Sequence, residues 1–158
     1  MALRTFRTMA FPAVLAAAIV LPVPYPGQSP RTNIRASDFR KLAWIAGDWV
    51  GSGGDYPAFY ERYTFVNDST IEQQSFSDET MQTVTDRATI ALRNGRITNT
   101  SGTSRYEAVA LDATGISFVS AKPGGNSFVF KRASKGRWLA TLRSTSGKRT
   151  IYEMRPKR

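Results

Sequence analysis

Residues 39–57 have the sequence FRKLAWIAGDWVGSGGDYP, which predicts a short helix, a glycine stop and a first β-strand. Just before this stretch, Ser37 suits the N-cap of the helix, and Asp38 suits its first turn, where the helix dipole favours a carboxylate. Gly47 suits the C-cap. The expected apolar face of the helix consists of Phe39, Leu42, Ala43 and Ala46.

Beyond the helix, short apolar runs alternate with turn residues as far as the C-terminus. The first strand is expected at residues 48–52, and the glycines at 51, 53 and 54 favour a bend, a bulge or a loop there. Asn94-Gly95 is the strongest hairpin signal and pairs Leu92 with Ile97. In the last strands the pattern places Phe128 opposite Leu142. It predicts an all-β fold, an antiparallel up-and-down barrel of about eight to ten strands with a short N-terminal helix.

The opening stretch resembles a motif of lipocalin-like bacterial domains, F-x-x-L-x-W-L-x-G-x-W-x-G. These domains include the nitrobindin-like haem-binding barrels and several uncharacterised secreted families. The matching residues are Phe39, Leu42, Trp44, Gly47, Trp49 and Gly51, with Ile45 in the leucine position. The resemblance implies a barrel closed at one end by an aromatic plug, with a cavity beyond it for an apolar or planar ligand.

Composition excludes several chemistries. The 158 residues contain no cysteine and no histidine, which removes disulfides, thiolate nucleophiles, Ser-His-Asp triads and the usual metal sites. Nitrobindin-like barrels bind ferric haem through a histidine, so that mechanism does not transfer to this chain. Tyrosinate can also ligate haem, but no tyrosine here is singled out for it. We expect no cofactor and no metal.

The N-terminal region resembles an export signal. Arg4 and Arg7 precede the apolar segment MAFPAVLAAAIVLPV, which Pro12 and Pro22 interrupt. We expect residues 1–23 to be a signal peptide or an N-terminal anchor, residues 24–36 a flexible linker, and residues 37–158 the barrel domain. The expected location is periplasmic or secreted, and the alternative is attachment to the inner membrane by an uncleaved segment.

Positive charge gathers in the last third of the chain. The formal net charge is +10, and residues 122–158 contain eleven basic residues and one acidic residue. Such a face can be a solvated surface, or it can attract an acidic protein or an anionic envelope surface. Nucleic acid is not the expected partner of an exported chain. The expected basic surface consists of Lys131, Arg137, Arg143, Arg149 and Arg155.

Glu61 is the most informative single residue. It shares a strand face with Phe59, Tyr63 and Phe65, so it becomes a buried carboxylate with a raised pKa if that face lines the barrel. The alternative is a structural ion pair or a solvated position on the outside. The full set of candidate ligand-binding residues is Trp49, Tyr56, Glu61, Tyr63, Asp86, Tyr106, Trp138 and Tyr152.

These features predict a barrel that binds a small apolar or amphipathic molecule without transforming it. The main alternative is an envelope interaction module that docks through the basic C-terminal face. An enzyme is not expected, because no nucleophile–base pair is visible in the sequence. A carboxylate-based hydrolase or isomerase would require a second acid beside Glu61.

Overall fold

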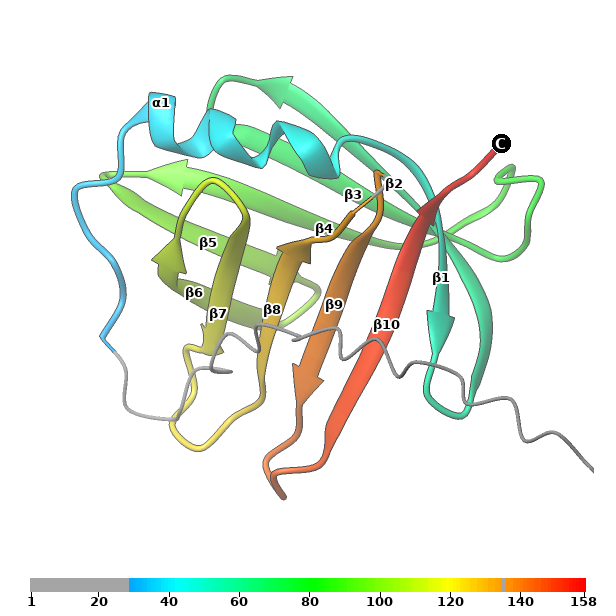
Figure 1. Ribbon diagram of the computed structural model, residues 1–158. Helices are drawn as coiled ribbons and strands as arrows, with labels where there is room; N and C mark the ends of the chain where they lie inside the picture. The colour runs from blue at the N-terminus through cyan, green and yellow to red at the C-terminus, as the bar shows by residue number, and fades with distance from the viewer. Residues whose placement is uncertain (1–28, 135) are drawn as a thin grey trace, which may run out of the picture.

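The computed structural model describes residues 29–134 and 136–158, which form a short helical segment and ten strands (Figure 1). Each strand pairs in antiparallel fashion with its neighbour in sequence, and the last pairs with the first, so the barrel is closed. The predicted all-β, up-and-down barrel is therefore confirmed. The strands are β1 (Gly47–Gly53), β2 (Tyr56–Asn67), β3 (Thr70–Phe76), β4 (Val84–Arg93), β5 (Arg96–Ser101), β6 (Ser104–Leu111), β7 (Gly115–Ser120), β8 (Ser127–Arg132), β9 (Trp138–Arg143) and β10 (Arg149–Pro156).

The predicted pairings across the turns are also confirmed. Leu92 lies opposite Ile97 in the β4–β5 hairpin, and Phe128 lies opposite Leu142 between β8 and β9. Asn94 and Gly95 both have positive φ angles, 50° and 71°. A two-residue turn with both central φ angles positive matches the twist of the strands it joins, which explains why this pair predicted the hairpin correctly.

The helical segment differs from the prediction in its period and its caps. It consists of α1 (Ala36–Phe39) followed by the 3₁₀ helix η1 (Arg40–Ile45). A 3₁₀ helix has three residues per turn, so Ile45 is buried with Phe39 and Leu42. The predicted members Ala43 and Ala46 are exposed.

Both predicted caps were wrong. Arg35, not Ser37, is the N-cap residue of α1, and the Asp38 carboxylate accepts a hydrogen bond from the Arg35 backbone N–H at 3.2 Å. At the other end Ala46 is the C-cap of η1, and Gly47 is the first residue of β1. Asp38 therefore accepts from the N–H of the cap residue itself, whereas a serine cap would accept from an N–H within the first turn.

One end of the barrel is closed by apolar side chains beneath the helical segment. Phe39 contacts Phe65 edge to face, with 5.9 Å between ring centroids. Trp49 donates a hydrogen bond from its indole nitrogen to the Ile45 carbonyl at 2.7 Å, and its ring meets Trp138 at 5.8 Å. These contacts tie the helical segment to the strands and fill that half of the barrel with a solid core.

Residues just before the helix lie against the barrel. The Arg31 backbone N–H donates to the Ala108 carbonyl at 2.8 Å, and the Ile34 N–H donates to the Gly95 carbonyl at 3.0 Å. Ile34 itself is buried. The last residues of the segment expected to be a linker therefore add contacts to the closed end.

The expected signal peptide or anchor, residues 1–23, lies outside the described residues, as do residues 24–28. Within the ranges that the structure describes, no helix is long and apolar enough to cross a membrane.

Candidate functional site

The half of the barrel away from the helical segment contains a cavity of about 270 Å³. The turns that join β1 to β2, β5 to β6 and β9 to β10 lie at the end of the barrel opposite the helical segment. The residues that line the cavity lie on the parts of the strands nearer to that end. Sixteen residues line the cavity: Phe59, Glu61, Tyr63, Gln73, Asp86, Ala88, Asn99, Ser101, Tyr106, Phe128, Phe130, Trp138, Ala140, Leu142, Tyr152 and Met154.

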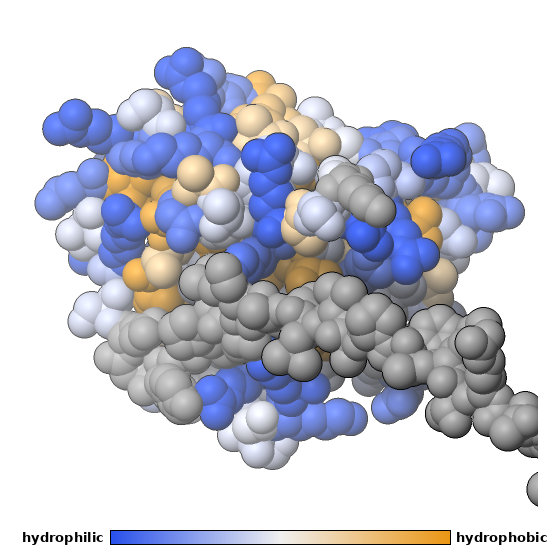
Figure 2. Space-filling view, in the orientation of Figure 1, coloured by the Kyte–Doolittle hydropathy of each residue, from blue (hydrophilic) through white to orange (hydrophobic). Residues whose placement is uncertain are grey.

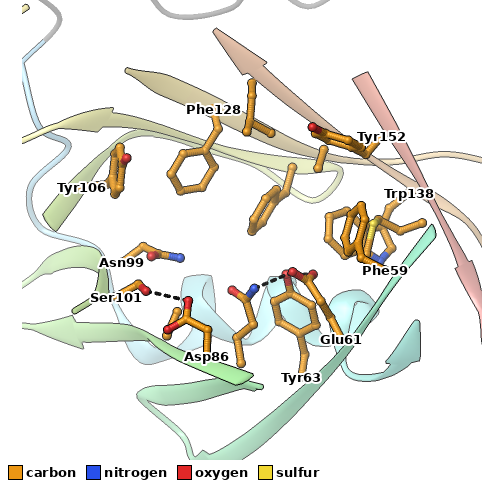
Figure 3. Close-up of a pocket in the computed structure, with 16 residues that line it drawn as sticks. Phe59, Glu61, Tyr63, Asp86, Asn99, Ser101, Tyr106, Phe128, Trp138 and Tyr152 are labelled. Atoms are coloured by element: carbon orange, nitrogen blue, oxygen red, sulfur yellow. Dashed lines mark hydrogen bonds between the residues drawn. The ribbon is translucent and has the colours of Figure 1, made fainter. Parts of the chain in front are cut away.

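The lining is divided into two walls of different chemistry. A polar wall comes from neighbouring strands β2 to β5 and consists of Glu61, Gln73, Asp86, Asn99 and Ser101. An aromatic wall comes mainly from β6 to β10 and consists of Phe59, Tyr106, Phe128, Phe130, Trp138 and Tyr152. Figure 3 shows Tyr106, Phe128 and Tyr152 on one side of the cavity, and Asn99, Ser101, Asp86 and Glu61 on the other.

Glu61 is held in place by two hydrogen bonds. The Tyr63 hydroxyl donates to its Oε2 at 2.8 Å, and the Gln73 amide nitrogen donates to its Oε1 at 2.9 Å. Burial raises the pKa of the Glu61 carboxyl above its ordinary value; the two hydrogen bonds act in the opposite direction, and the charge of Asp86 raises it further. Of the two interpretations of Glu61 from sequence, the structure supports the carboxyl inside the barrel. The interpretation that the pattern favoured, a structural ion pair or a solvated position on the outside, is wrong.

Asp86 and Asn99 complete the polar wall. The Ser101 hydroxyl donates to one carboxylate oxygen of Asp86 at 3.0 Å (Figure 3). The Asn99 side chain is only 5% exposed and faces the cavity, and it has no hydrogen-bond partner among the described residues. The donors and the acceptor of this amide are therefore available to whatever occupies the cavity.

The aromatic wall is packed edge to face. Tyr106 and Phe128 have ring centroids 4.9 Å apart, and Phe59 and Tyr152 are 5.3 Å apart. Trp138, 1% exposed, stands where the wall meets the closed core and contacts Phe130 at 5.0 Å. Such a wall offers aromatic faces and edges to an apolar body.

Phe59 has this position because β1 contains a glycine opposite it. A Cβ atom on Gly51 would lie 2.2 Å from the Phe59 ring, so a larger residue would displace that ring. The β1–β2 register shifts between Gly51 and Gly53, so the ladder is irregular where the glycines predicted a bend, a bulge or a loop. The glycines of the opening motif therefore shape the cavity wall.

The structure places six of the eight predicted ligand-binding residues in the cavity lining: Glu61, Tyr63, Asp86, Tyr106, Trp138 and Tyr152. Trp49 belongs to the core beneath the helical segment and does not line the cavity. Tyr56 is 69% exposed and lies at the rim, in a neighbouring hollow that also contains Arg143 and Lys148.

Sequence reasoning missed the amide side chains of the polar wall. Gln73 lies two residues after Ile71, and Asn99 lies two residues after Ile97. Both isoleucines are fully buried, and residues two apart in a strand share a face. That spacing was the available signal for an amide pointing into the barrel.

The predicted basic surface is partly neutralised. Glu153, on the outer face of β10, forms ion pairs with Arg137 at 2.5 Å and with Arg155 at 2.7 Å. Arg143 and Arg149 lie directly opposite each other in the β9–β10 ladder, as expected. Figure 2 shows hydrophilic side chains interrupted by hydrophobic patches on the face it presents.

Within the described ranges, no group of three or more acidic residues is placed to hold a metal ion. No model of a known protein family matches the chain. No curated protein matches it either. The closed antiparallel barrel is consistent with a lipocalin-like fold.

Proposed function

We propose that the barrel binds a small amphipathic molecule in its cavity and does not transform it. The observation that carries this proposal is the division of the lining into an aromatic wall and a polar wall. Ligand sites in proteins are typically concave and largely apolar, with a few polar groups that fix orientation. The aromatic wall would bury the body of the ligand, while Glu61, Asp86 and Asn99 would orient its polar end.

The cavity is tested with N-phenylnaphthylamine, an uncharged fluorescent probe whose emission rises in apolar surroundings. Saturable binding to the wild-type protein supports the proposal. Ala88→Leu places a larger side chain in the cavity and should weaken binding about tenfold, because even one extra methylene is felt in a packed interior. Ala110→Leu, on an exposed position of β6, is the matched control and should bind as the wild type does. If the wild-type protein shows the near-ultraviolet circular dichroism of a folded protein and yet neither it nor any variant binds the probe, the proposal is refuted.

We also infer that the chain is exported and works in the periplasm or outside the cell. Support comes from the basic and apolar N-terminal sequence. Mass spectrometry of the protein purified from an envelope fraction tests this inference. A chain shortened near residue 23 supports it, whereas a full-length chain held in the membrane fraction favours the anchored alternative.

A second candidate function is catalysis by the two carboxyl groups. One observation favours it: Glu61 and Asp86 face the same cavity, and the charge of Asp86 contributes to the raised pKa of Glu61. Two carboxyls with unequal environments are a common acid–base arrangement. Turnover of nitrophenyl glycosides or esters that disappears in Glu61→Gln would support this candidate, and no turnover would favour simple binding.

A further inference from the structure

We propose that the ligand is an organic cation, an amine carried on an aromatic body. This inference rests on the proposed function and specifies the class of molecule that the cavity takes. Three features of the lining support it: two carboxyl groups without a basic partner, an unpaired amide beside them, and an aromatic wall opposite.

The first feature is uncompensated negative charge. Glu61 and Asp86 line the cavity, and no lysine or arginine is among its described lining residues. The arginines nearest in sequence are committed elsewhere, because Arg62 pairs with Asp48 at 2.6 Å and Arg87 lies 4.0 Å from Glu72. Glu61 is the more buried of the two, whereas Asp86 is exposed. A carboxylate removed from water, as that of Glu61 is, is costly unless a counter-charge accompanies it. A bound cation would supply that counter-charge.

The second feature is unused hydrogen-bonding capacity. Each oxygen of Glu61 accepts one hydrogen bond from the protein, from Tyr63 or Gln73, although a carboxylate oxygen can accept two. The Asn99 side chain, 5% exposed, has no partner among the described residues. The polar wall therefore presents free carboxylate acceptors on Glu61 beside the donors and the acceptor of the Asn99 amide. An ammonium group has three N–H donors and no acceptor, which complements such a wall.

The third feature is the opposite wall. Phe128, Tyr106 and Tyr152 face the polar wall across the cavity (Figure 3). Aromatic faces attract cations and stack against aromatic rings. An amine on an aromatic body would satisfy both walls at once, whereas a plain acyl chain would leave the carboxyls without a partner.

The rim makes an anionic ligand the natural competitor. Lys148 and Arg143 line the neighbouring hollow beside Tyr152. They lie near the β9–β10 turn, on the aromatic side, and do not line the cavity itself. A carboxylate ligand would place its charge at this rim, so the test compares both signs of charge on one scaffold.

The experiment measures the dissociation constants of three matched probes by calorimetry: naphthylethylamine, naphthylethanol and naphthylacetate. We expect the amine to bind about tenfold more tightly than the alcohol, the value of one charge-assisted hydrogen bond. The acetate should bind most weakly. Glu61→Gln and Asp86→Asn should each reduce the advantage of the amine over the alcohol. Glu72→Gln, on the outer side of the neighbouring strand, is the control and should preserve it.

A pH series gives an independent readout. Deprotonation of Glu61 should tighten amine binding as pH rises through its raised pKa, while binding of the alcohol stays constant. Equal affinity for amine and alcohol, or tighter binding of the acetate, would overturn the cation inference and leave the proposed function standing. Binding by none of the three probes, nor by N-phenylnaphthylamine, would overturn both.

Discussion

Tyr63 and Glu61, two residues apart on β2, are joined by a hydrogen bond of 2.8 Å from the phenol to the carboxylate. Because they share a strand face, both point into the barrel. Tyr63 is 2% exposed, and burial, followed by the charge of Glu61, raises its pKa well above the ordinary value. The phenol therefore remains a donor, and it links the solid core to the polar wall of the cavity.

The first prediction concerns stability and pH. Burial raises the folded-state pKa of Glu61 above 4.5, so the folded protein holds this proton more tightly than the unfolded chain does. Its stabilising effect is complete below the ordinary pKa and is lost as pH rises through the raised one. Urea unfolding should therefore show that the wild type loses stability relative to Glu61→Gln as the pH rises from the ordinary pKa of a glutamate through the raised pKa of Glu61. The control Glu72→Gln should follow the wild type; parallel curves for all three would contradict the assignment.

The second prediction is for Tyr63→Phe. The ring keeps its contacts with Trp138 and Phe130, 5.7 and 6.4 Å away, but loses the hydroxyl. We expect a loss of about 1 kcal/mol in the free energy of unfolding. The pKa of Glu61 should rise further, because the lost hydrogen bond lowers it. Carbon-detected NMR titration of the Glu61 carboxyl checks this, and an unchanged titration curve would show that the bond is absent in solution.

The third prediction tests the junction between core and cavity. Trp138 is 1% exposed and contacts Trp44, Trp49 and Phe130 edge to face. Trp138→Ala should lower the free energy of unfolding by about 3–5 kcal/mol, the usual cost of removing a large buried ring. Tyr56→Ala, at a residue 69% exposed, should change it by less than about 0.5 kcal/mol. Similar losses in the two variants would contradict this distribution of packing.

The fourth prediction compares two glycines with positive φ. At Gly53, with φ 142°, a Cβ would lie 2.2 Å from the Ile151 carbonyl oxygen; at Gly102, with φ 53°, it would meet nothing within 4 Å. Gly53→Ala should cost more than about 2 kcal/mol, and Gly102→Ala about 1 kcal/mol from backbone strain alone. Thermal melting of the two variants tests this prediction. Equal losses of stability would mean that the Ile151 carbonyl does not crowd Gly53.

The fifth prediction concerns the outer face of β10. Glu153 pairs with both Arg137 and Arg155, and hydrogen bonding to Arg155 is the largest cause of its lowered pKa. Glu153→Gln should cost about 0.5–1 kcal/mol at low salt, because partly exposed ion pairs contribute little. The loss should shrink in high salt, where the repulsion between the two arginines is screened. Glu79→Gln in the exposed β3–β4 turn is the control, and a salt-independent loss would point to packing instead.

The architecture could be predicted from sequence because the strands pair with their neighbours. Alternation and turn chemistry act over a few residues, so Asn94-Gly95 set one register and short turns set the others. The helical segment was mispredicted in detail because a 3₁₀ helix and an α-helix share their first buried positions, here Phe39 and Leu42. Beyond Leu42 they diverge, since an α-helix would bury Ala43 and Ala46, whereas the 3₁₀ helix buries Ile45. Tertiary packing beneath the barrel end decides between them.

The cavity was harder to predict than the fold. Alternation shows that Glu61 shares a face with Phe59 and Tyr63, but it cannot tell which layer of a barrel is filled and which is hollow. Trp49 and Trp138 look equivalent in sequence, yet one belongs to the core alone and the other also lines the cavity. The difference depends on how far each residue lies along the barrel axis, which follows from the stagger of all ten strands together.

The pairing of β1 with β10 has a consequence for the order of folding. Every other strand pair joins neighbours in sequence, whereas Trp49 meets Pro156 across almost the whole domain. Local hairpins form early, and contacts between distant residues carry a larger loop-closure cost. The cavity is therefore completed only when β10 docks against β1, after all the other strands have been synthesised. Until then β1 and β9 present unpaired edges, so a truncation before Arg149 would yield an aggregation-prone open sheet.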